Sequence, residues 1–241
     1  MKMERTQIGE LSAVLTGQLK SPQAMVVLCH GYGASGDDLV GIGDAILSQF
    51  PDLAESTMWV FPEAPLSLDV GPYSGRAWWH LNVAALAEAV ERGELSAVKE
   101  AFPPGIERAR SQLSDLVEQL LTTHNLSHDR LVLGGFSQGA MLATDVALHL
   151  DHKPALLVVY SGSLICRSEW SELAAREPKF RVFQSHGTVD PILAPAMGDA
   201  LRLLLEESGH DVTFQSFHGG HTIPMEAIAK LADEVRTLVS V

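Results

Sequence analysis

Short apolar runs alternate along the chain with longer amphipathic segments, and this alternation limits the fold more than any other feature of the sequence. Each run is short and rich in Val, Leu, Ile and Phe, a composition typical of strands buried on both faces of a parallel sheet. The clearest runs are 24–29, 58–61, 130–133, 155–160, 181–185 and 212–217. Their order along the chain predicts an α/β fold with a mostly parallel central sheet and helices on both faces.

The segment 106–124 has the clearest helical pattern, because its apolar residues, Ile106, Leu113 and Leu120 among them, recur at spacings of three and four. Pro103 and Pro104 precede it, and a first helical turn accepts proline. Further helices are predicted at 38–50, 140–148, 199–208 and 224–238. The length of 241 residues fits a single α/β domain over residues 1–241.

The stretch 63–104 interrupts this rhythm. It contains several Gly and Pro residues, the pair Trp78-Trp79 and a short helical pattern around 81–92. Connections of this length in a compact domain are often lids or walls of a binding pocket. We therefore expect a lid-like or pocket-wall excursion here, and the alternative is a surface excursion with its own small apolar cluster.

The charge and the hydropathy pattern exclude several classes of function. Lys and Arg number 17 against 30 Asp and Glu, a net charge of −13, which disfavours binding to nucleic acid or to an anionic membrane surface. No apolar run approaches the roughly twenty residues of a membrane-spanning helix, and the first residues lack the apolar core of a signal peptide. The expected location is the cytoplasm. Two cysteines, Cys29 and Cys166, cannot form a disulfide framework or a paired-cysteine zinc site.

The segment Gly135-Phe136-Ser137-Gln138-Gly139 matches the pattern G-x-S-x-G. A strand pattern runs directly into it and a helical pattern leaves it, which is the arrangement of a nucleophile elbow. Such a turn raises the serine hydroxyl above the end of the sheet. It also places the Gln138 backbone N–H at a helix start, where it can stabilise an oxyanion.

A serine nucleophile needs a histidine base and an acid that orients this base, and in this architecture they follow the serine in the order acid, histidine. Asp190 comes after the strand pattern at 181–185, and His221 comes after the last strand pattern and two glycines. His218 is the competing base, and His186 is expected to be structural. A zinc site built from these histidines and Asp190 is the alternative, but it leaves the elbow unexplained.

The second oxyanion donor is expected early in the sheet. The strand pattern at 24–29 is followed by His30-Gly31-Tyr32-Gly33, which is close to the HG-type oxyanion segment. The donor would be the backbone N–H of Tyr32. Cys29 lies inside the apolar run and is predicted to be a buried strand residue.

Taken together, these motifs resemble the phospholipase/carboxylesterase family of α/β-hydrolases, which includes acyl-protein thioesterases. The matching segments are 28–33, 61–65, 76–79, 134–140, 160–162, 186–191 and 220–221. The resemblance implies an α/β-hydrolase fold with Ser137 as nucleophile, His221 as base, Asp190 as its partner and the Tyr32 and Gln138 amides as oxyanion hole. It also implies an apolar acyl pocket near the excursion, touching Trp79, Ile192 and Leu193.

The resemblance further implies a small-molecule ester or acyl substrate and a reaction that needs no metal ion or organic cofactor. It is also compatible with a homodimer. Tyr32 stands where the family commonly has leucine, and the Trp78-Trp79 segment and an extra helical segment expected near 88–102 also depart from the family pattern. These departures concern the choice of substrate. The predicted function is a serine carboxylesterase, with thioesters or lysophospholipids as other substrates. The alternatives are a dienelactone-hydrolase-like lactonase, which would carry cysteine in the elbow, and a catalytically silent ligand-binding α/β-hydrolase.

Overall fold

The structure is a computed structural model of the chain, and it describes residues 3–70, 73–82, 88, 92 and 95–240. Its centre is an eight-stranded sheet with the order β1-β2-β4-β3-β7-β8-β9-β10. From β4 to β10 every neighbouring pair is parallel, whereas β1 and β2 join the edge in antiparallel pairs. The strands are β1 (Glu4–Ile8), β2 (Leu11–Gly17), β3 (Ala24–Cys29), β4 (Thr57–Pro62), β7 (Leu131–Phe136), β8 (Leu156–Tyr160), β9 (Arg181–Gly187) and β10 (Asp211–Phe217).

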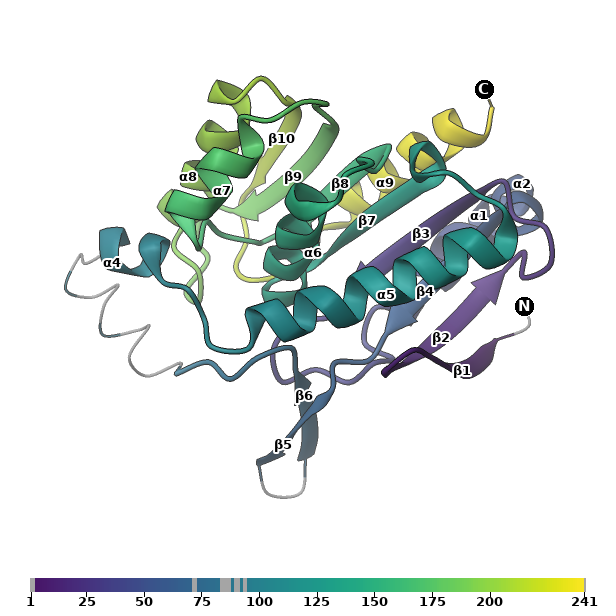
Figure 1. Cartoon of the computed structure of the whole chain (residues 1–241), viewed down its shortest axis with the longest axis horizontal. Helices are drawn as coiled ribbons and strands as arrows, with labels where there is room; N and C mark the ends of the chain where they lie inside the picture. The colour runs from purple at the N-terminus through teal and green to yellow at the C-terminus, as the bar shows by residue number, and fades with distance from the viewer. Residues whose placement is uncertain (1–2, 71–72, 83–87, 89–91, 93–94, 241) are drawn as a thin grey trace.

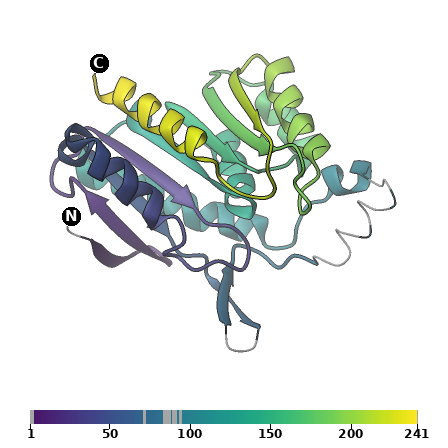
Figure 2. The same ribbon diagram turned by 180° about the vertical axis from the view of Figure 1, so that it is seen from behind.

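Helices cover both faces of this sheet, so the predicted fold class is confirmed (Figures 1 and 2). One face carries α5 (Ile106–His124), α6 (Gln138–His149), α7 (Arg167–Ala174) and α8 (Pro195–Glu207). The other face carries α1 (Val40–Gln49), α2 (Pro51–Ser56) and α9 (Met225–Val239). None of the described helices is both long enough and apolar enough to cross a bilayer.

The two helical layers explain why the inner strands are apolar throughout. In β3, Met25 and Val27 belong to the core beneath α5 and α6, while Val26 and Leu28 belong to the core beneath α1 and α9. Successive side chains of a strand point to opposite faces, and in β3 the side chains on both faces are buried. The edge strand β10 is half exposed along its length and correspondingly more polar.

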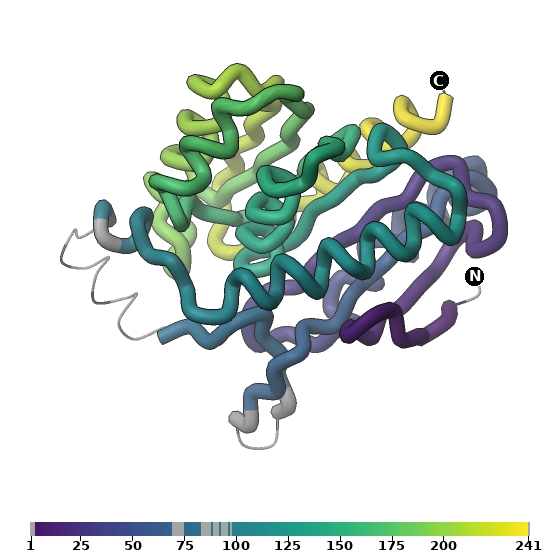
Figure 3. The backbone as a smooth tube through the Cα atoms, viewed as in Figure 1, coloured from purple at the N-terminus to yellow at the C-terminus, as the bar shows by residue number. Residues whose placement is uncertain are grey.

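Within the described part of the stretch 63–104, the chain forms an antiparallel hairpin and a short helix. The hairpin strands β5 (Leu66–Val70) and β6 (Tyr73–Ala77) form a separate two-stranded sheet. This hairpin projects away from the main body (Figure 3). The short helix is α4 (Leu95–Glu100). The helix expected around 81–92 lies mostly outside the described residues. The sequence patterns also missed β1, β2, β5, β6, α2 and α7.

Candidate active site

Ser137 occupies the sharp turn between β7 and α6. Its backbone has φ 54° and ψ −119°, which an L-residue rarely adopts and which costs about 1–3 kcal/mol. The turn is held by a hydrogen bond of 2.9 Å from the Ser137 N–H to the Tyr160 carbonyl on the next strand. A Cβ atom at Gly135 or Gly139 would lie 2.5 or 2.1 Å from the Cys29 carbonyl oxygen, so both positions require glycine. The predicted strand–turn–helix arrangement is present.

Asp190 and His221 come together at the ends of β9 and β10. The His221 Nδ1 lies 2.7 Å from Asp190 Oδ2, so this nitrogen donates to the carboxylate and Nε2 is the ring nitrogen left to act as a base. The other carboxylate oxygen, Oδ1, accepts hydrogen bonds from the Ile192 and Leu193 N–H groups at 2.8 and 2.9 Å. Burial alone would raise the pKa of Asp190, but the hydrogen bonds from His221 and these two amides outweigh it and lower the pKa below its usual value.

His221 rather than His218 reaches this acid. The His218 side chain follows β10 and is exposed, and it is not among the described residues that line the site. The His221 ring packs against the Phe136 ring with centroids 4.7 Å apart, which places it over the elbow. His186, expected to be structural, is buried beside Asp190.

Ser137 and His221 line one cavity of about 820 Å³, together with Gly31 and Tyr32. A volume of this order is typical of pockets for small-molecule ligands. Most of its wall is apolar and comes from α4, α6, α8 and the loops that follow the strands. The apolar lining includes Leu81, Val98, Phe102, Met141, Ile165 and Met197.

Two of the three residues predicted for the acyl pocket line this cavity. They are Leu193, which is buried in the wall, and Ile192, which is 52 % exposed. Trp79 does not line it, contrary to prediction. Its side chain is fully buried in the core beneath α5 and lies under the turn at Gly105. The next two residues, His80 and Leu81, line the cavity, whereas the Trp79 indole is packed in the core.

The loop with the predicted oxyanion donor Tyr32 is held by strand β6 of the excursion. Gly33 N–H donates to the Arg76 carbonyl at 2.8 Å, and Arg76 N–H donates to the Ala34 carbonyl at 2.9 Å. A Cβ atom at Gly75 would lie 2.5 Å from the Gly33 oxygen, so the two backbones are in close contact. Among the described residues, none accepts a backbone hydrogen bond from the Tyr32 N–H, which leaves this donor available to a ligand.

The side chain of Gln138 joins the elbow to the same excursion. Its Oε1 accepts from the Trp78 N–H at 3.0 Å and its Nε2 donates to the Trp79 carbonyl at 2.8 Å. The Trp78 indole N–H in turn donates to the His30 carbonyl at 2.9 Å. Sequence reasoning gave Gln138 a role through its backbone alone. Its side-chain role was missed because its partners are some sixty residues away and are backbone groups, which carry no sequence signal.

His30 supports the loop from inside. Its Nδ1 lies 2.8 Å from the Gly31 carbonyl and donates to it, and its Nε2 accepts from the Ala64 N–H at 3.1 Å. Burial lowers the pKa of His30 below its usual value, although the bond to Gly31 opposes this. The neutral ring therefore bridges the loop and the start of the excursion.

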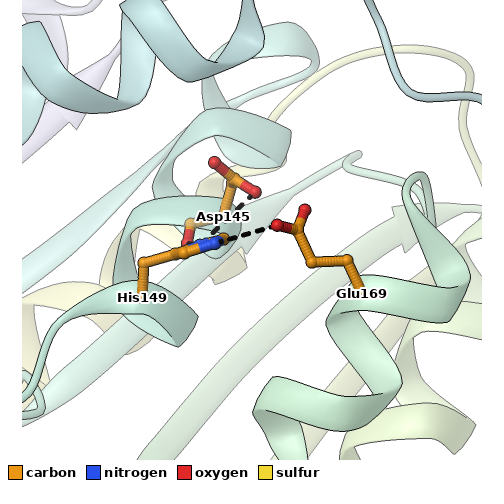
Figure 4. A group of neighbouring side chains, drawn as sticks. All are labelled: Asp145, His149 and Glu169. Carbon is orange, nitrogen blue, oxygen red and sulfur yellow. Dashed lines mark hydrogen bonds and ion pairs between the residues drawn. The ribbon is translucent and has the colours of Figure 1, made fainter.

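Within the described part of the chain, one group of side chains has the composition of a metal site: Asp145 and His149 on α6 with Glu169 on α7 (Figure 4). The Asp145 carboxylate is already bound. Arg110 Nε lies 2.6 Å from its Oδ2, and Trp170 Nε1 donates to its Oδ1 at 2.8 Å. A buried carboxylate with both oxygens engaged by an arginine and an indole is a structural ion pair that ties three helices together.

The comparisons with known proteins agree with the geometry. The family model for phospholipase/carboxylesterase matches residues 11–239. Acyl-protein thioesterase 1 of Neurospora crassa is 27 % identical over 220 residues, covering 87 % of this chain and 84 % of that protein. The thioesterase of the same name from Kluyveromyces lactis is 29 % identical over 231 residues, covering 92 % and 95 %.

Solved structures share the fold over almost the whole chain. The crystal structure of esterase PE8 has a TM-score of 0.76 at 24 % identity and covers 99 % of this chain and 100 % of its own. A carboxylesterase from Mesorhizobium loti has a TM-score of 0.75 at 17 % identity, covering 98 % and 99 %. The match of the family model across nearly the full length shows that this chain belongs to the phospholipase/carboxylesterase family.

Proposed function

We propose that this chain is a serine hydrolase that cleaves carboxylic esters through an acyl-enzyme on Ser137. The observation that carries the proposal is the placement of Ser137, in its strained turn, in the same cavity as a His221 ring that is hydrogen-bonded to Asp190 at 2.7 Å. Neither a binding pocket nor a core needs this combination. It matches the requirements of nucleophilic acyl transfer.

In this mechanism the Ser137 hydroxyl attacks the ester carbonyl while His221 Nε2 takes its proton. Asp190 holds the ring in the tautomer with the proton on Nδ1 and stabilises the imidazolium that forms. The Tyr32 and Gln138 N–H groups bind the oxyanion of the tetrahedral intermediate. His221 then returns its proton to the leaving alcohol. A water molecule, deprotonated by His221, attacks the acyl-enzyme. His221 gives this proton to Ser137 Oγ as the bond between Oγ and the acyl carbon breaks, and the acid is released.

The cavity favours an apolar acyl group. Its walls are mostly aliphatic and aromatic side chains, and of its described lining residues only Asp38 carries a fixed charge. Lys and Arg are not among them, so nothing in this part of the wall would bind a carboxylate or phosphate near the reacting ester. We therefore propose carboxylic esters with an uncharged acyl chain as the main substrates. Thioesters are the second candidate, because the thioesterases named above are similar over most of their length.

The test is hydrolysis of p-nitrophenyl esters from acetyl to palmitoyl, by wild type and Ser137→Ala side by side. We expect turnover that depends on Ser137, with an optimum at an acyl length that the cavity accommodates. A matched pair of one acyl group as oxygen ester and as thioester measures the preference between the two classes. Turnover that Ser137→Ala retains would refute the proposed nucleophile.

A further inference from the structure

His186 is a buried histidine beside the acid of the proposed triad. It lies near the end of β9, four residues before Asp190, and its side chain is 2 % exposed. Its Nε2 is 2.9 Å from the Leu193 carbonyl oxygen. Because a carbonyl only accepts, Nε2 carries a proton and donates it to Leu193, which leaves Nδ1 as the second ring nitrogen. That Nδ1 is buried and has no hydrogen-bond partner among the described residues.

A buried polar atom without a partner costs about 1–3 kcal/mol, and such an atom in a native fold calls for an explanation. An aromatic ring without nitrogen would fill the same space without this cost. The fold nevertheless fits closely around the imidazole. A Cβ atom at Gly198 on α8 would lie 2.4 Å from Nδ1, so glycine at this position leaves room for the ring.

The Nε2–H of His186 acts on the segment that surrounds the Asp190 carboxylate. It binds the carbonyl of Leu193, the same residue whose N–H donates to Asp190 Oδ1. The same nitrogen is 3.5 Å from Asp190 Oδ2, the oxygen that accepts the hydrogen bond from His221. At that distance the contact is an electrostatic attraction rather than a full hydrogen bond. The His186 Nε2–H is therefore close to two oxygens, the Leu193 carbonyl oxygen and Asp190 Oδ2, and both influence the orientation of the Asp190 carboxylate.

We propose that His186 is a positioning residue for the reaction: its Nε2–H fixes the 190–193 segment so that Asp190 Oδ2 stays aimed at His221. It does not touch the substrate, since it is not among the described residues that line the cavity. The inference rests on the proposed function, because it assigns how the acid of that triad is held. Imidazole is required here for its donor, which accounts for the orphaned Nδ1.

Two substitutions distinguish the role of the His186 hydrogen-bond donor from the role of its ring in filling space. His186→Phe keeps an aromatic ring and removes the donor, and His186→Gln keeps an N–H at a similar distance from the backbone. His210→Phe is the matched control, because His210 is also buried and bonded to backbone, at Phe180 and Ala174, but lies outside the cavity lining. For each variant, kcat and KM are measured with one p-nitrophenyl ester. Rates are normalised to active sites titrated with a fluorophosphonate.

We expect His186→Phe to lower kcat per titrated site by about 10²-fold with KM within about threefold, because misplacing a positioned group affects the transition state. His186→Gln recovers most of the loss, and His210→Phe loses stability but keeps kcat. A wild-type kcat in His186→Phe, or equal losses in the Phe and Gln variants, would overturn the inference. Ser137→Ala is measured in the same series, so a failure of the proposed function itself is seen separately.

A measurement on the wild-type protein keeps the inference testable if His186→Phe does not fold. A proton–nitrogen correlation spectrum of the histidine rings reports which nitrogen of each ring carries the proton. The inference requires that His186 carries a proton on Nε2. A ring protonated at Nδ1 alone would overturn it, since the bond to Leu193 would then be absent.

Discussion

The Gln138 side chain offers a quantitative test of how the elbow and the excursion are joined. The change Gln138→Met keeps the length of the side chain and removes both polar groups. The Trp78 N–H and the Trp79 carbonyl, bonded to Gln138 at 3.0 and 2.8 Å, then lose their partners. Gln138 is fully buried, so water cannot replace these bonds.

Each buried backbone group left unpaired costs about 1–3 kcal/mol, so the two together should lower the free energy of unfolding by about 2–6 kcal/mol. That is a large share of the roughly 5–15 kcal/mol that a domain has. The oxyanion loop is affected as well, because Trp78 holds the His30 carbonyl through its indole N–H. We expect kcat to fall about tenfold, less than the 10²–10³-fold that follows removal of an oxyanion donor.

The assay is urea unfolding at fixed pH followed by tryptophan fluorescence, with kcat measured separately without urea. Gln112→Met on α5 is the matched control. Gln112 is also buried, but its Oε1 has no partner among the described residues and its Nε2 donates to the exposed Glu10. Its loss leaves no buried group unpaired, so we expect a change below about 1 kcal/mol. An equal loss in the free energy of unfolding for Gln138→Met and Gln112→Met would refute the argument that the Gln138 bonds join the elbow to the excursion.

Three further changes test the elbow and the acid. Ser137→Gly should abolish turnover and raise the free energy of unfolding by about 1 kcal/mol, because glycine accepts φ 54° without strain; a loss of stability in thermal denaturation would contradict this. Asp190→Asn should lower kcat by about 10⁴-fold through the wrong His221 tautomer. Because the native pKa of Asp190 lies below its usual 3.8, the charged form stabilises the fold fully above that pH and this stability is lost as the pH falls through the native pKa. The stability difference between wild type and Asp190→Asn should therefore shrink in urea titrations below about pH 4, and a difference independent of pH would count against the assigned hydrogen bonds. Gly139→Ala would bring a Cβ atom to 2.1 Å from the Cys29 oxygen and should cost at least about 3 kcal/mol, whereas Gly41→Ala on α1, where the Cβ meets open space, should be neutral or stabilising in the same melts.

The sequence predicted best those parts of the fold whose signal is local. The inner strands are continuous apolar runs because both faces are covered, and the run 24–29 coincides with β3. Helix α5 coincides with the predicted 106–124 because its buried face repeats at helical spacing and Gly105 and Asn125 bound it in left-handed conformations. The two antiparallel strands β1 and β2 were missed. β1 in particular is largely exposed and polar, so it lacks the pattern that marks an inner strand.

In the candidate site, too, some residues could be predicted from local sequence signals and others could not. Ser137, Asp190 and His221 could be predicted as the candidate triad because strand ends, glycines and chain order point to them one at a time. What holds them was not found, since the bonds from Gln138 to the Trp78-Trp79 backbone, from Trp78 to the His30 carbonyl and from His186 to the Leu193 carbonyl all end on backbone atoms. A backbone acceptor is present at every residue, so no residue type marks the partner. The wrong placement of Trp79 in the acyl pocket has the same origin. Two adjacent tryptophans in the sequence suggest the aromatic wall of a pocket. In the fold, Trp78 uses its indole N–H to support the oxyanion loop, and Trp79 offers its carbonyl to the elbow and its ring to the core. The residues proposed to react can thus be predicted from their chemistry and chain order, whereas the bonds that hold them become visible only in the folded chain.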